Sequence, residues 1–183
     1  RYTADISTTA FELDLFGRLQ SLSDAALNRY FGTEAAARAI RLTLIGDIAD
    51  AWLTYAADRS LLQLAQDTAA NARESVRLTR LRLEGGIAPR TDLRQAEQVL
   101  ATAEADIAAQ TTALAQDINA LQLLVGAPVD EALLPQSIAD AEGAVKTLPA
   151  GLDSAVLLRR PDVMQAEFAL RAANAEIGAA RAA

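Results

Sequence analysis

Residues 83–97 read LEGGIAPRTDLRQAE, and this stretch separates two long segments that are rich in alanine. Gly85 and Gly86 readily adopt the positive backbone φ angles at which helices end, and Pro89 prevents the first helix from continuing. Asp92 then stands where a second helix would begin. The stretch therefore predicts the tip of a helical hairpin, with the turn at residues 85–90.

Apolar or small residues recur at spacings of three and four on both sides of this tip. The series before it is Leu61, Ala65, Thr68, Ala72, Ser75, Thr79 and Leu83. The series after it is Leu93, Ala96, Leu100, Ala103, Ile107, Gln110 and Leu114. Such spacings are typical of a coiled-coil seam. We therefore predict an all-α chain in which residues 17–126 form a coiled-coil hairpin.

The helix before the tip is predicted to be unusually long, because residues 18–84 contain no proline. At ~1.5 Å per residue it would extend about 100 Å, and it would need packing partners along all of that length. The helix after the tip covers roughly half the distance before it meets Gly126 and Pro128. Residues 154–183 are predicted to pack against the remaining length of the long helix, which the helix after the tip does not cover.

This third, returning segment is marked by Pro161, which opens a helix. Its apolar series is Val163, Ala166, Leu170, Ala173, Ile177 and Ala180. We expect the third helix to stack end to end on the helix that follows the tip. Residues 127–153, which contain several prolines and glycines, are predicted to be a loop-rich segment beside the helices.

Composition supports close helix packing and excludes several classes of function. Hydrophobic residues make up 51% of the chain but aromatic residues only 4%, so alanine and leucine carry most of the apolar content. The formal net charge of -7 argues against nucleic-acid binding, which usually requires a basic surface.

Enzymatic chemistry is also disfavoured by the residue types present. The chain has no cysteine and no histidine, and it has no glycine-rich loop of the kind that holds phosphates. The paired carboxylates Asp47 and Asp50, and Glu104 and Asp106, are interpreted as solvated helix faces. We expect neither an enzyme nor a metal or cofactor site.

Residues 1–10 differ from the rest, because apolar and polar side chains alternate along RYTADISTTA. Alternation is the period of a β-strand. It fits an edge strand of any sheet, and it also fits a strand of a transmembrane β-barrel. Residues 1–16 are therefore predicted to be the end of a strand and the entry to the first helix.

Four stretches of the sequence together resemble a known family. They are FELDLFGRL at 11–19, GGIAPRTDLRQAE at 85–97, NALQLLVG at 119–126, and LPAGLDSAVLLRRPDVMQAEFALRAANAEIGAARAA at 148–183. In them the chain is similar to the outer membrane factors, the TolC-like and OprM-like exit ducts of bacterial tripartite efflux pumps, which include NodT-type lipoproteins.

The resemblance implies a homotrimer whose subunits each contain two similar repeats, with strands in an outer membrane β-barrel and long helices in a periplasmic α-barrel. This chain would be a periplasmic fragment of the first repeat. Its partners would be a periplasmic adaptor (membrane fusion) protein and an inner-membrane pump of the RND type. Export of drugs or other small molecules through such a duct is passive, so no ATP site and no cofactor is expected.

The resemblance also assigns roles to the hairpin tip. The residues that would dock the adaptor are Gly85, Gly86, Ile87, Ala88 and Pro89. Small residues at a tip allow another helix pair to approach closely. Pro89 stands where similar ducts often carry serine or threonine. Without the resemblance, the same residues would be interpreted as a simple turn.

Asp92 matches a carboxylate that, in similar ducts, helps to hold the periplasmic aperture closed by contacts with the second repeat. A carboxylate in the first turn of a helix also stabilises it through the helix dipole, by about 0.3 to 1 kcal/mol. The two roles are compatible.

Six arginines form a basic cluster near the tip: Arg73, Arg77, Arg80, Arg82, Arg90 and Arg94. We interpret most of this cluster as ordinary surface in which Glu74, Glu84 and Glu97 pair with the arginines. A role in docking or selectivity is the alternative. Farther from the tip, Asp47, Asp50 and Asp58 are predicted either to line a lumen or to face a neighbouring helix.

A second class of function would also explain the helical pattern. A soluble helical-hairpin interaction protein, such as a periplasmic adaptor or a coiled-coil scaffold, would carry the same apolar spacing. An adaptor, however, should have short glycine- and valine-rich strands on both sides of its hairpin. The flanking stretches here, FELDLFG and RRPD, favour the duct.

Overall fold

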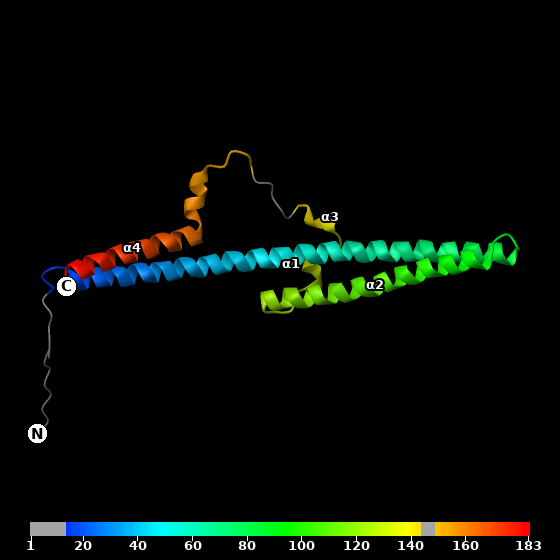
Figure 1. Ribbon diagram of the computed structural model, residues 1–183, viewed down its shortest axis with the longest axis horizontal. Helices are drawn as coiled ribbons and strands as arrows, with labels where there is room; N and C mark the ends of the chain where they lie inside the picture. The colour runs from blue at the N-terminus through cyan, green and yellow to red at the C-terminus, as the bar shows by residue number, and fades with distance from the viewer. Residues whose placement is uncertain (1–13, 144–148) are drawn as a thin grey trace, which may run out of the picture. The chain divides into compact units, whose positions relative to one another are not determined.

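The computed structural model describes residues 14–143 and 149–183, and these are arranged as helices joined by turns (Figure 1). The elements in chain order are α1 (Arg18–Glu84), α2 (Arg90–Val125), η1 (Glu131–Leu133), α3 (Ile138–Ala141), η2 (Ser154–Arg159) and α4 (Pro161–Arg181). The described residues contain no strand, so the predicted all-α fold is confirmed for them. The strand predicted at residues 1–10 lies outside the described residues.

Helix α1 is a single uninterrupted helix of 67 residues. It begins after Gly17, whose carbonyl accepts a hydrogen bond from the Ser21 N–H at 2.9 Å. The chain divides into two compact units, and α1 contributes to both of them. One unit contains residues 1–43 and 149–183, and the other contains residues 44–148.

In the second unit, α1 and α2 lie side by side as the predicted hairpin (Figure 1). The core of this unit is a cluster of large buried side chains: Tyr55, Leu62, Leu114, Leu121 and Leu134. Closer to the tip the buried seam residues become small, with Ala69, Ala72 and Ala103. Small side chains allow the two helices to approach closely there.

The observed seam agrees with the predicted series on α2 but differs from it on α1. The predicted positions Leu61, Thr68 and Ser75 are exposed, and Leu62, Ala69 and Val76 are buried in their place. The positions between these residues, such as Ala72, belong to both the predicted and the observed series, and both series have spacings of three and four. The apolar valine and alanine pack between the helices, whereas threonine and serine keep their hydroxyl groups on the accessible side.

The segment after α2 returns to the side of α1. Gly126 ends α2 with a positive φ of 74°, and its N–H donates to the Gln122 carbonyl at 2.8 Å. The indole N–H of Trp52 donates to the carbonyl of Leu133 at 3.0 Å. Farther along, the Ile138 N–H donates to the Ser60 hydroxyl at 2.9 Å. These two hydrogen bonds attach η1 and α3 to α1.

In the first unit, α4 packs against the first part of α1. The rings of Phe31 and Phe168 are 5.5 Å apart, and the Phe168 Cβ lies 3.6 Å from where a side chain would begin at Gly32. Arg29 and Glu176 form an ion pair between the two helices. The prediction that α4 covers part of the long helix is confirmed by these contacts.

The face that α4 uses for this packing is not the predicted one. Ala172 and Ala179 are buried, whereas Leu170 and Ile177 of the predicted series are 63% and 50% exposed. At 3.6 residues per turn the predicted series lies on the opposite side of α4 from the buried alanines. Phe168 lies on the packed side, next to Gly32 of α1. Helix α4 thus has two apolar sides, one of which is exposed.

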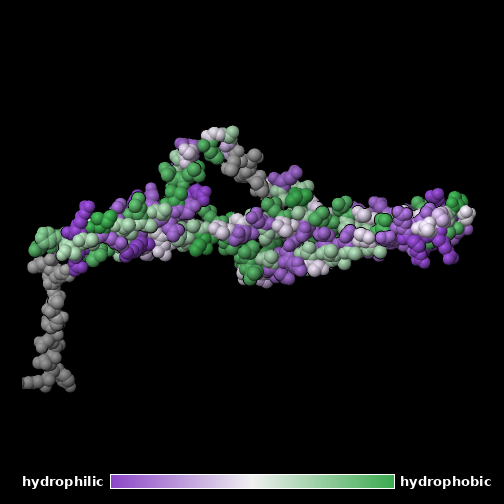
Figure 2. Space-filling model, in the orientation of Figure 1, coloured by the Kyte–Doolittle hydropathy of each residue, from purple (hydrophilic) through white to green (hydrophobic). Residues whose placement is uncertain are grey.

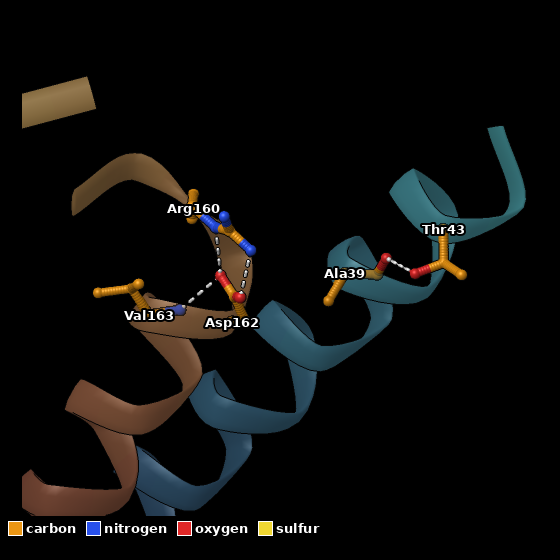
Figure 3. A network of polar contacts seen from close by, with 5 residues as sticks. All are labelled: Ala39, Thr43, Arg160, Asp162 and Val163. Carbon is orange, nitrogen blue, oxygen red and sulfur yellow. Dashed lines mark hydrogen bonds and ion pairs between the residues drawn. The ribbon is translucent and has the colours of Figure 1, made fainter. Parts of the chain in front are cut away.

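The start of α4 is fixed by Pro161 at its first position and by a local ion pair (Figure 3). The Arg160 guanidinium donates to the Asp162 carboxylate through Nε at 3.1 Å and Nη2 at 2.8 Å. The same carboxylate accepts the Val163 N–H at 2.9 Å. This arrangement satisfies a backbone donor that the first turn of a helix would otherwise leave unpaired.

Candidate functional site at the hairpin tip

The tip turns through residues 85–89 by backbone hydrogen bonds that return to the end of α1. The Gly86 N–H donates to the Leu83 carbonyl at 3.0 Å, and the Ile87 N–H donates to the Arg82 carbonyl at 2.8 Å. Gly86 has a φ of 69°, in the left-handed region that favours glycine. Gly85 does not need this conformation, since it is absent from the residues with positive φ in the described chain.

The predicted docking residues differ in how accessible they are. Ile87 is 73% exposed and projects an apolar side chain from the turn, whereas Ala88 is only 8% exposed. Pro89 precedes α2 in an extended conformation, with φ -76° and ψ 160°. Ile87 is therefore the tip residue that offers most apolar surface to a partner, and Ala88 is part of the packing inside the hairpin.

A shallow groove of about 250 Å³ runs between the two helices just behind the turn. Its walls are Ala72, Ser75 and Thr79 from α1 and Asp92, Gln95, Ala96 and Val99 from α2. Because most of these side chains are small, the groove could receive side chains of another helix. Asp92 places a carboxylate at its edge.

Asp92 itself is exposed in the first turn of α2, as predicted. Its nearest polar partner is the hydroxyl of Thr91, at 3.5 Å from Oδ1. Within residues 14–143 and 149–183, no arginine or lysine forms a salt bridge with it. Its charge is therefore available to a group outside these residues.

Most of the predicted basic cluster is paired with glutamates. Arg73 of α1 contacts Glu104 of α2 at 3.0 Å. Glu97 of α2 receives Arg80 from α1 at 3.4 Å and Arg94 from its own helix at 2.9 Å. The pairing predicted for Glu97 is confirmed, and two of these contacts join the arms of the hairpin. Exposed ion pairs of this kind each contribute little to stability.

Arg77 pairs with Glu74 on the same helix, at 2.6 Å. The hydrogen bond from Arg77 holds the pKa of the Glu74 carboxyl below its usual value. The Arg82 and Arg90 side chains are exposed. In Figure 2, hydrophilic residues (purple) predominate around the tip, and hydrophobic residues (green) remain exposed among them.

Away from the tip, the structure brings together two carboxylates that the sequence pattern did not connect. Asp58 of α1 and Asp117 of α2 meet at the level of the buried core. Asp58 thus faces a neighbouring helix, which was one of its two predicted environments. Asp117 could have been identified from the sequence, because it continues the predicted series three residues after Leu114.

Metal-ligating groups and membrane-spanning helices are not found in the described part of the chain. No group of three or more metal-ligating side chains occurs there. None of the helices there combines the length and the apolar character that a membrane span requires.

Comparison with known proteins identifies the family. Residues 1–127 match the model of the outer membrane efflux protein family. The chain is 44% identical, over 96% of its own length, to the solvent efflux pump outer membrane protein SrpC of Pseudomonas putida. It is 42% identical, over 99% of its length, to the cation efflux system protein CusC of Escherichia coli strain K12. It spans 37% of the first relative and 40% of the second.

Solved structures agree with this match. The crystal structure of CusC superposes with a TM-score of 0.86 at 41% identity, covering 94% of this chain and 40% of that one. The open-state outer membrane channel MtrE of Neisseria gonorrhoeae gives a TM-score of 0.79 at 40% identity, covering 93% and 38%. Both the sequence and the arrangement of helices place this chain in the outer membrane efflux protein family.

Proposed function

We propose that this chain forms part of the periplasmic, helical section of an outer membrane efflux channel that works in a tripartite pump. The observation that carries the proposal is an identity above 40%, over nearly the whole chain, to outer membrane proteins of efflux pumps. The channel provides a passive exit, and the pump in the inner membrane supplies the energy. The exported compounds are drugs or other small molecules.

Exposed apolar surface on the helices supports an assembly with further helices. Helix α4 buries one apolar side against α1 and leaves Leu170 and Ile177 on the other. On α1, Leu64 and Leu81 are also 60% and 53% exposed. Apolar stripes of this extent call for partners. A second repeat and the neighbouring subunits of a homotrimer would cover them.

At the tip, the proposed partner is the helical hairpin of a periplasmic adaptor protein. Ile87 offers the exposed apolar side chain, Gly86 leaves space beside it, and the groove behind the turn is lined by small residues. The arginines near this groove are largely neutralised by glutamates. Contact through shape and apolar surface is therefore favoured over contact through charge.

The alternative of an adaptor or a free-standing coiled-coil scaffold has no support in the comparisons, since the relatives and solved structures named above are outer membrane efflux proteins and channels. The function is tested by deleting the gene that encodes this protein and measuring susceptibility to drugs, solvents and metal cations. Return of resistance with the complete wild-type gene is expected. Unchanged susceptibility to all of these compounds after deletion would contradict an efflux role.

The docking site is tested separately by site-specific photo-crosslinking in living cells. A benzophenone side chain at position 87 is expected to give a covalent adduct with the adaptor. The matched control is position 123, where Leu123 is 83% exposed near the far end of α2. Equal adduct formation from both positions, or adducts from position 123 alone, would contradict docking at the tip.

A further inference from the structure

The α1–α2 seam contains two carboxylates at positions that are otherwise apolar. On α1, Asp58 lies three residues after Tyr55 and four before Leu62. On α2, Asp117 lies three residues after Leu114 and four before Leu121. All four flanking side chains belong to the buried core cluster. Both aspartates thus stand where the spacing of the seam directs side chains between the helices.

The environment of Asp117 is unsuited to a second negative charge. Its Oδ2 atom is inaccessible to solvent and has no hydrogen-bond donor within the described residues. Burial raises the pKa of the Asp117 carboxyl, and the charge of Asp58 and a hydrogen bond with Asp58 raise it further. Two ionised carboxylates can only accept hydrogen bonds, so the two groups can hydrogen-bond to each other only when one of them carries a proton.

Charged groups on the packed elements leave the pair without compensation. The segment that packs on the core carries the exposed groups Asp130, Glu131 and Asp140, of which Asp130 and Asp140 accept backbone N–H groups of their own segment. Arg59, next to Asp58, is the nearest cation in the sequence, but it is not among the causes of the Asp117 shift. Within the described residues, no ion pair joins an arginine or lysine to either carboxylate.

We propose that Asp117 keeps its proton and donates it toward the carboxylate of Asp58 when the hairpin is closely packed, and that loss of this proton loosens α1 from α2 at this level. The packing of α1 against α2 at the level of the core cluster then depends on pH. This inference rests on the seam of the chain itself and does not depend on the proposed transport function.

The direction of the effect follows from linkage. A carboxyl whose pKa is raised by folding binds its proton more tightly in the packed state, so its contribution to stability is present at low pH. The contribution is lost as the pH rises through the raised pKa. The pKa of the Asp117 carboxyl is raised from the ordinary aspartate value of 3.8. The packing of α1 against α2 around Asp117 should therefore weaken as the pH increases.

Hydrogen exchange of the complete protein, followed by mass spectrometry at pH 4 and pH 7, tests the proposal. Exchange is corrected for its intrinsic pH dependence and read in peptides covering residues 50–62 and 110–125. In the wild type, protection in these peptides should be about twofold or more lower at pH 7 than at pH 4. Protection of residues 20–35 should not follow it.

Asp117→Asn mimics the protonated group, so it should abolish the difference between the two pH values and raise protection at pH 7. Asp58→Asn should reduce the difference without abolishing it, because it removes the charge beside Asp117 while the burial of Asp117 remains. Asp106→Asn, which alters an exposed aspartate on the same helix, should leave the wild-type difference unchanged. The readout is a ratio within each variant, so a general change in stability does not imitate it.

A wild-type ratio near one would overturn the proposal. So would a difference that persists in Asp117→Asn, one that is unchanged in Asp58→Asn, or one that is lost in Asp106→Asn.

Discussion

At the scale of single residues, the turn of the hairpin places its strictest demand on Gly86, where φ is 69°. An alanine there must adopt the left-handed conformation, which costs about 1–2 kcal/mol. We therefore expect Gly86→Ala to lower the melting temperature by several degrees in thermal unfolding followed by circular dichroism.

Gly85→Ala is the matched control for this prediction. A Cβ at Gly85 would lie 3.4 Å from the Leu81 carbonyl oxygen, which is an ordinary contact, and its φ is not positive. Gly85→Ala should therefore change the melting temperature much less than Gly86→Ala. Equal effects of the two variants would show that the left-handed conformation is not what limits the turn.

The second prediction at this scale concerns Asp92, whose carboxylate is exposed and lacks a cation within the described residues. If it helps to close the periplasmic aperture, Asp92→Ala in the complete channel removes an ionic contact worth up to about 1 kcal/mol. The open fraction should then rise by up to about fivefold. Single-channel conductance and antibiotic leakage measure it, with Asp106→Ala as the control. Unchanged values in Asp92→Ala would exclude the role.

A pH effect of opposite sign is expected at Asp162. The hydrogen bonds from Arg160 hold the pKa of this carboxyl below the ordinary value of 3.8. A carboxyl whose pKa is lowered by folding stabilises the fold above that ordinary value, and this contribution is lost as the pH falls through the lowered pKa. The first turn of α4 should therefore fray below about pH 4.

Hydrogen exchange at residues 163–166 between pH 3 and pH 6 checks this prediction, with residues 170–176 of the same helix as the internal reference. Asp162→Asn should exchange faster than the wild type at pH 6 and show no further loss at pH 3. A wild-type first turn that stays as protected at pH 3 as at pH 6 would contradict it.

Some residues could be predicted from the sequence and others could not. The left-handed Gly86 and the first-turn position of Asp92 depend on local chemistry, and Gly-Gly and Pro indicate both. The meeting of Asp58 with Asp117 depends on how two segments 59 residues apart come into register. The register was implicit in the series that runs from Leu93 to Leu114, but an aspartate in that series does not appear as a packing residue in a search for apolar side chains.

At the scale of elements, the two faces of α2 differ strongly in how exposed their leucines are. Leu121 is 2% exposed in the core, whereas Leu123, two residues later, is 83% exposed. Leu121→Ala should lower the free energy of unfolding of the chain by about 2–4 kcal/mol because it leaves a cavity between the helices. Leu123→Ala should change it by less than about 0.5 kcal/mol.

Denaturant unfolding of both variants measures this difference. Similar losses in the two variants would mean that the core cluster does not determine the stability of the hairpin.

The helices illustrate what periodicity can and cannot predict. Their existence followed from the long runs of spacing three and four, and their ends followed from glycine and proline. The packed face of α2 was predicted correctly. On α1, half of the predicted seam positions were wrong by one residue. On α4, the prediction chose the wrong side of the helix. An alanine-rich helix has apolar residues on more than one side, so the face that packs is decided by which partner fits closely, as Gly32 and Phe168 do.

At the scale of the whole molecule, apolar surface remains after every described helix has found a partner within the chain. If Leu170 and Ile177 contact other subunits or a second repeat, the double variant Leu170→Gln, Ile177→Gln should reduce the assembled fraction of the complete protein in detergent. Its helix content should be unchanged, because both side chains point away from α1. Light scattering measures the mass, and circular dichroism measures the helix content.

Glu167→Gln is the control for this variant, since it changes an exposed residue on the same helix without changing apolar area. A double variant that assembles as fully as the wild type would show that this side of α4 is not an interface.

One hydrogen bond described above supplies the molecule with its own optical reporter. Trp52 is the single tryptophan of the chain, and its indole donates to the Leu133 carbonyl. Its fluorescence therefore senses whether the segment after α2 is seated on α1. Detachment would expose the indole to water and shift its emission to longer wavelengths, so that local release of this segment can be followed in real time without any added label.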